Sequence, residues 1–88
     1  MIELEVKMFG AFREWAPSGV LTVKVTPEMT LEQFRRCFIE SLKQKEPSFQ
    51  EETLVFESAF ATDDTILTDT DIVSSYQTLA VLPPVCGG

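Results

Sequence analysis

Residues 79–88 read Leu-Ala-Val-Leu-Pro-Pro-Val-Cys-Gly-Gly, a short apolar run followed by a double proline and a diglycine. The four consecutive apolar residues 79–82 are typical of a short strand that is covered on both faces. Pro83 cannot donate a hydrogen bond to a sheet, and Pro84 keeps Pro83 in an extended conformation. The sequence therefore predicts a buried strand that ends at Leu82 and a stiff segment beyond it.

The segment after this strand has the composition of a tail that enters a partner. Residues 83–88 span roughly 20 Å at about 3.3 Å per residue. Gly87 and Gly88 have no Cβ, so they fit a narrow channel and leave the Gly88 carbonyl unhindered. We expect a flexible tail that presents the Gly88 carboxylate in the cleft of another protein; a frayed end without function is the alternative. The residues expected to be inserted are Pro83, Pro84, Val85, Cys86 and Gly87.

The first part of the chain has the pattern of a β-hairpin. Apolar and charged residues alternate over residues 2–8, and a second alternating run covers residues 21–25 and stops before Pro27. This period of two predicts two strands, each with one exposed face. Residues 13–19 contain turn-forming residues and are expected to connect the strands.

A helix is predicted from Leu31 to about Lys45. Thr30 and Gln33 have the spacing of a capping box, in which each side chain binds the backbone of the other residue. Apolar residues then recur at helical spacing, and Pro47 opposes further continuation.

The segment between this helix and the last strand is expected to contain one more strand and two turns. Residues 54–60 are predicted to form the third strand, and residues 62–65 and 68–71 to form turns. Four aspartates occur between Asp63 and Asp71. Their spacing lacks the glycine and the distant glutamate of a calcium-binding loop, so we expect them to cap the turns.

Composition indicates one small domain without catalytic chemistry of its own. The 88 residues carry a formal charge of −7, which opposes binding to nucleic acid or an anionic membrane and favours a basic protein partner. There is no histidine, and the two cysteines, Cys37 and Cys86, are expected to be reduced. No metal site of the usual Cys/His kind and no Ser-His-Asp triad is expected. The start of the chain lacks the pattern of a secretion signal, so we expect a cytoplasmic location.

The order of the predicted elements indicates an α+β fold. A mixed sheet packed on one main helix buries the apolar face of both layers, and a central last strand would pair on both edges. This arrangement is the ubiquitin-like β-grasp, with a domain at residues 1–82 and the extended C-terminal tail at residues 83–88.

The sequence resembles the small sulfur-carrier proteins of the ubiquitin-like superfamily, most closely the small subunit of molybdopterin synthase (the MoaD type). The resemblance covers almost the whole chain, although only the C-terminal motif is specific. It lies in residues 2–12 with their Phe-Gly-Ala-Phe-Arg-Glu end, in the Leu-Thr-Asp-Thr-Asp-Ile-Val turn at residues 67–73, and in residues 79–88.

The resemblance implies a carrier subunit of a sulfurtransferase complex. An adenylyltransferase of the kind that activates ubiquitin (the MoeB type) would adenylate Gly88 with ATP, and a sulfur donor would convert it to a thiocarboxylate. The large subunit of molybdopterin synthase (the MoaE type) would then receive the tail and use the sulfur in molybdenum cofactor biosynthesis. No cofactor bound to the chain itself is implied.

Three features depart from the family pattern. Thr70 stands where the family often has glycine, and residues 74–78 resemble an insertion before the last strand. Cys86 stands where a small hydroxyl residue is common. Cys86 is either a tolerated small side chain or a thiol that forms an internal acyl disulfide with the terminal thiocarboxylate.

Other functions remain open at this point. A thiamin-type sulfur carrier and a ubiquitin-like protein modifier would both use the same activation step, whereas a noncovalent β-grasp interaction module would not need Gly88. Docking to a partner is expected to use apolar residues near the tail. The candidates are Phe9, Phe60 and Leu67, with Val85, Phe56 and Trp15 as further choices.

Overall fold

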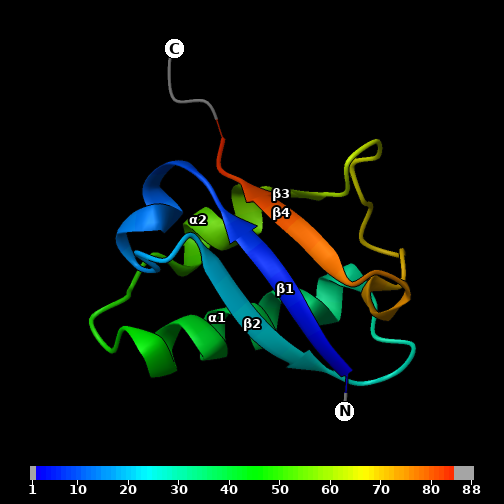
Figure 1. Cartoon of the computed structure of the whole chain (residues 1–88), viewed down its shortest axis with the longest axis horizontal. Helices are drawn as coiled ribbons and strands as arrows, with labels where there is room; N and C mark the ends of the chain where they lie inside the picture. The colour runs from blue at the N-terminus through cyan, green and yellow to red at the C-terminus, as the bar shows by residue number, and fades with distance from the viewer. Residues whose placement is uncertain (1, 85–88) are drawn as a thin grey trace.

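The structure, a computed structural model, describes residues 2–84 and shows a sheet packed against one long helix (Figure 1). The sheet order is β2-β1-β4-β3; β1 and β4 run parallel at its centre, and each edge strand is antiparallel to its neighbour. The predicted central position of the first and last strands is therefore confirmed. In chain order the described elements are β1 (Ile2–Met8), the 3-10 helix η1 (Gly10–Glu14), β2 (Val20–Val25), α1 (Leu31–Lys45), α2 (Glu52–Glu57), β3 (Ala59–Ala61), the 3-10 helix η2 (Val73–Ser75) and β4 (Thr78–Leu82).

The hairpin of β1 and β2 forms as the alternating pattern predicts. Its register runs from Ile2 opposite Val25 to Lys7 opposite Val20. Along β1 the residues Leu4, Val6 and Met8 are buried while the residues between them are exposed. One face of the sheet therefore contributes apolar side chains to the core, and the other carries charge.

Helix α1 covers the apolar face of the sheet, and its observed bounds match the predicted ones. The capping box is confirmed: the Thr30 hydroxyl accepts a hydrogen bond from the Gln33 amide, and the Gln33 side chain accepts one from the Thr30 amide. Five residues of the helix are buried at helical spacing: Leu31, Phe34, Phe38, Ile39 and Leu42.

The prediction of a strand over residues 54–60 is wrong for most of that segment. Residues 52–57 form α2, and β3 is limited to Ala59–Ala61. The run is apolar, but the buried positions Val55 and Ser58 are three residues apart, which suits a helical turn and not a strand. The Ser58 hydroxyl also donates to the Leu54 carbonyl at 2.6 Å and satisfies one acceptor at the end of this helix.

Two of the three predicted docking residues belong to the core. Phe60 is fully buried and lies edge-to-face against Phe34 and Phe38, with ring centroids 5.4 and 5.3 Å apart. Leu67 is 5% exposed, and its amide donates to the Phe60 carbonyl. The prediction that Phe60 and Leu67 form an exposed docking surface is therefore wrong, because both fill the space between the sheet and α1.

None of the helices within residues 2–84 is long and apolar enough to cross a membrane.

Replacing Phe60 by alanine is expected to lower the free energy of unfolding by about 3–5 kcal/mol, because a fully buried ring leaves a cavity. Phe9, which is 42% exposed, should lose about 1 kcal/mol or less on the same change. Urea unfolding followed by the fluorescence of Trp15 measures both values. Equal losses for the two variants would contradict the assignment of Phe60 to the core.

Candidate functional site

Strand β4 ends where the double proline begins, as predicted. Leu82 is the last residue of the strand, Pro83 is half-buried and Pro84 is exposed. The remaining predicted site residues, namely Val85, Cys86, Gly87 and Gly88, lie outside the described residues. The structure therefore defines the base of the proposed tail and the surface around it.

The parallel pairing of β1 and β4 brings two exposed apolar residues to this base. Met8 pairs with Val81, and both are buried; the next residues along each strand direction, Phe9 and Leu82, are 42% and 37% exposed. Because side chains alternate along extended backbone, these two lie on the outer side of the sheet.

We name the apolar surface formed by Phe9, Leu82, Pro83 and Pro84 the exit surface. Phe9 is thus the one predicted docking residue of the first three that the structure leaves accessible. The sequence analysis does not name Leu82 as a docking residue. Its place directly before Pro83, on the same strand face as Ala80, could have indicated that its side chain lies beside the base of the tail.

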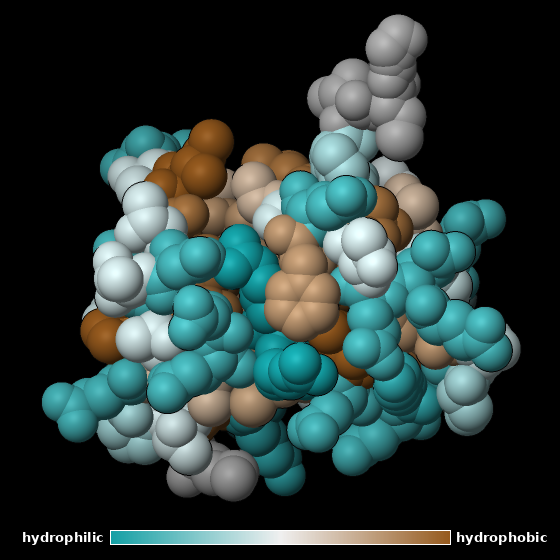
Figure 2. Space-filling view, turned by 180° about the vertical axis from the view of Figure 1, so that it is seen from behind, coloured by the Kyte–Doolittle hydropathy of each residue, from teal (hydrophilic) through white to brown (hydrophobic). Residues whose placement is uncertain are grey.

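The other exposed aromatic residue named from the sequence, Phe56, lies on α2 with the Arg36 guanidinium 5.7 Å from its ring centre. Trp15 is half-buried against Phe12 and Phe49. Phe56 therefore interacts locally with α1, and Trp15 belongs to the edge of the core. Figure 2 shows the side opposite that of Figure 1, where hydrophilic residues cover most of the surface and apolar residues form separate small areas.

Two of the four aspartates between residues 63 and 71, Asp64 and Asp71, cap turns as predicted. Asp64 accepts hydrogen bonds from the hydroxyls of Thr62 and Thr65, and Asp71 accepts from the amide of Thr68. Asp69 forms an ion pair with Arg35 of α1. Within residues 2–84, no three Cys, Asp or Glu side chains are arranged to hold a metal ion.

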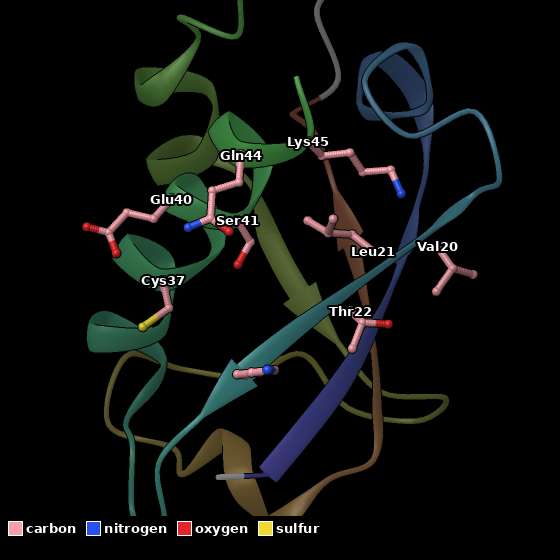
Figure 3. A pocket seen from close by; sticks show the side chains of 9 residues that line it. Val20, Leu21, Thr22, Cys37, Glu40, Ser41, Gln44 and Lys45 are labelled. Carbon is pink, nitrogen blue, oxygen red and sulfur yellow. The ribbon is translucent and has the colours of Figure 1, made fainter. Parts of the chain in front are cut away.

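A hollow of about 690 Å³ lies between the edge strand β2 and α1 (Figure 3). It is lined by Val20, Leu21, Thr22, Lys24, Cys37, Glu40, Ser41, Gln44 and Lys45. In the figure Glu40 points away from β2.

Cys37 is the thiol of this hollow, and its surroundings make it a weak nucleophile. Burial raises the pKa of its thiol, and the Glu40 carboxylate raises that pKa further. The thiol is protonated near neutral pH, and only the thiolate attacks electrophiles well. Cys37 is unpaired. This environment is typical of a structural cysteine.

Comparison with known proteins supports the fold. Two solved structures, described as SAMP1 from Haloferax volcanii and as H. volcanii small archaeal modifier protein 1, superpose with TM-scores of 0.67 and 0.66. The alignments cover 98% and 97% of this chain and 99% and 100% of those chains, at 19% sequence identity in both cases. The fold is the ubiquitin-like β-grasp.

No family model matches the sequence, and no curated protein matches it. At 19% identity the likeness to the two modifier structures concerns the β-grasp fold alone. The predicted fold class is therefore confirmed.

Replacing Glu40 by glutamine should lower the pKa of the Cys37 thiol toward its ordinary value, because one of the two causes of the upward shift is removed. The rate of alkylation of Cys37 near pH 8 is then expected to rise roughly twofold, the effect of one partly screened charge. The measurement is made in a Cys86→Ser background so that Cys37 is the single cysteine.

Glu32→Gln, a change on the same helix at a carboxylate that does not shift Cys37, is the matched control. An unchanged or lower alkylation rate in Glu40→Gln would contradict the stated cause.

Proposed function

We propose that this chain is a ubiquitin-like sulfur carrier, the small subunit of a molybdopterin synthase. The observation that carries the proposal is the position of β4: a central, doubly paired strand stops at Leu82 directly before Pro83-Pro84. The sequence Val-Cys-Gly-Gly follows this anchored base. A rigid base and a terminal diglycine together suit a protein whose own carboxyl group reacts in a partner's active site.

The proposed reaction has two steps. The Gly88 carboxylate attacks the α-phosphorus of ATP, pyrophosphate leaves, and an acyl adenylate forms. Hydrosulfide from the sulfur donor then attacks the Gly88 carbonyl, the bond to AMP breaks and AMP leaves, and the thioacid loses its proton to give the thiocarboxylate. The missing side chains of Gly87 and Gly88 support this assignment, because they leave the carbonyl open to both partners.

The catalytic groups in this scheme belong to partners. The chain has no histidine, and burial raises the pKa of the Cys37 thiol. The chain therefore offers few groups for acid-base or nucleophilic catalysis near neutral pH. An adenylyltransferase of the MoeB type would bind ATP, and a large subunit of the MoaE type would hold the precursor that receives the sulfur.

Docking in this proposal uses the exit surface together with the charge of the chain. Phe9 and Leu82 supply exposed apolar area beside the tail, and the net charge of −7 favours approach to a basic cleft. The apolar contact would fix the register of the bound tail, and the charge would accelerate encounter.

A ubiquitin-like protein modifier is the second candidate. The observation in its favour is that both superposed structures are described as small archaeal modifier proteins. This function would use the same adenylated Gly88, but the carbonyl would pass to a lysine amine instead of a sulfur atom. The Pro-Pro-Val-Cys-Gly-Gly end resembles the molybdopterin type more closely, and we therefore rank sulfur transfer first.

The proposal predicts that dithiolene formation depends on the last residue. The thiocarboxylated protein should form the dithiolene product when it is mixed with the large subunit and the precursor. The variant that lacks Gly88 should give at least about a hundredfold less product, because its terminal carbonyl is displaced from the reacting position. Ile66→Ala, an exposed apolar change beyond the far end of β3, is the control and should be fully active. A truncated protein as active as the full chain would contradict sulfur carriage and favour a noncovalent module, whereas isopeptide adducts to lysines without dithiolene product would favour a modifier.

Phe9→Ala is expected to weaken association with the large subunit by about tenfold, because it removes exposed apolar area next to the tail. The association rate of the wild-type protein should also fall as salt rises. Surface plasmon resonance at several salt concentrations measures both effects. An affinity unchanged by Phe9→Ala would exclude the exit surface from docking, and an on-rate independent of salt would exclude electrostatic steering.

A further inference from the structure

Gly10 lies against the first proline of the tail. It follows Phe9, begins η1 and has a φ of +58°. A Cβ at this position would lie 2.7 Å from the Pro83 Cγ and 3.6 Å from its Cδ. Two non-bonded carbons are best separated by about 3.5–4.0 Å, so a side chain here overlaps the proline ring.

The backbone on the Gly10 side of this contact is held firmly. The Met8 amide donates to the Gly19 carbonyl at 2.8 Å, and the Phe12 amide donates to the Phe9 carbonyl at 3.2 Å. Phe12 is fully buried and packs edge-to-face against Phe38 of α1. The turn that contains Gly10 is thus anchored in the core and cannot move aside at low cost.

The Pro83 side is constrained as well. Its neighbour Leu82 pairs with Ala59 of β3, and the preceding Val81 pairs with Met8 of β1. The pyrrolidine ring fixes φ, and a change of ring pucker is the one motion by which its Cγ can move away without moving the backbone. Two rigid parts of the molecule therefore meet at a contact that only glycine permits.

We propose that Gly10 is a positioning residue for the tail: the space left by its missing Cβ seats the Pro83 ring, so that the chain leaves the domain from one fixed point and in one direction. The positioning role rests on the proposed function, since a fixed exit matters to a partner that must receive Gly88. A partner that meets an oriented tail orders fewer residues on binding, and it binds the carrier more tightly for that reason.

Gly19 supplies a matched control within the same connection. Its φ is +85°, so alanine is strained there as at Gly10, but no atom lies within 4 Å of a Cβ built on Gly19. Gly10→Ala and Gly19→Ala share the backbone strain and differ in the contact with Pro83. The difference between the two variants therefore separates the effect of the Gly10–Pro83 contact from that of general destabilisation.

The first experiment uses the free protein and needs no partner. In the wild type we expect nuclear Overhauser contacts between the Gly10 α-protons and the Pro83 ring protons. Gly10→Ala should shift the Pro83 ring carbons and the Leu82 amide, and Gly19→Ala should leave both unchanged. If the wild type lacks these contacts, or if the Pro83 signals are the same in all three proteins, Gly10 does not hold the Pro83 ring and the proposal is wrong.

The second experiment measures adenylation by a MoeB-type enzyme as a function of carrier concentration. Gly10→Ala should raise KM about tenfold, the factor for ordering roughly one further backbone residue, and leave kcat unchanged. Gly19→Ala should match the wild type. If Gly10→Ala is folded, as judged by urea unfolding, and its KM is unchanged, the positioning role is wrong and the proposed function stands. If the wild type is not adenylated, the proposed function is wrong. The spectra of the free protein would then still show whether Gly10 contacts Pro83.

The double variant Gly10→Ala/Pro83→Ala provides the remaining test. Removing the ring relieves the overlap, so the KM of the double variant should equal that of Pro83→Ala alone. This comparison also serves if Gly10→Ala by itself does not fold. If the KM of the double variant instead rises by the product of the two single-variant effects, Gly10 and Pro83 act independently and the proposal is wrong.

Discussion

The parallel pairing of β1 with β4 is the constraint on which the rest of the structure depends. Glu5 to Met8 lie opposite Thr78 to Val81, so the two strands end on the same side of the sheet. β3 pairs with the other edge of β4, and the last strand is therefore held by ladders on both sides. Because of this pairing, Phe9 and Gly10 lie beside Leu82 and Pro83, where the tail begins.

Much of this fold follows from local patterns in the sequence. Alternation in residues 2–8 identifies β1, the capping box at Thr30 and Gln33 identifies the start of α1, and the apolar residues before Pro83 identify β4. In each case one periodic pattern or one backbone restriction determines the element. The segment at residues 52–61 was predicted less well, because its short apolar run suits a strand or a helix and only packing selects the helical turn.

The candidate site likewise has features that local patterns predict and features that only packing determines. The end of β4 before Pro83 could be predicted from the sequence, because the backbone restrictions of proline do not depend on tertiary contacts. The choice among Phe9, Phe60 and Leu67 could not be made, since an apolar residue in a short apolar segment looks the same in sequence whether it faces the core or solvent. The contact between Gly10 and Pro83 could not be predicted from local patterns, because the two residues are far apart along the chain and close only through the β1–β4 register.

We propose that the β-grasp domain presents Gly88 for activation by another protein, and mass spectrometry after incubation with ATP and a MoeB-type adenylyltransferase can detect that activation. We expect a species heavier by one adenylyl group, mapped to Gly88 and absent when Gly88 is deleted. If no adduct forms, or if the adduct lies on another residue, Gly88 is not the activated group and the proposal is wrong.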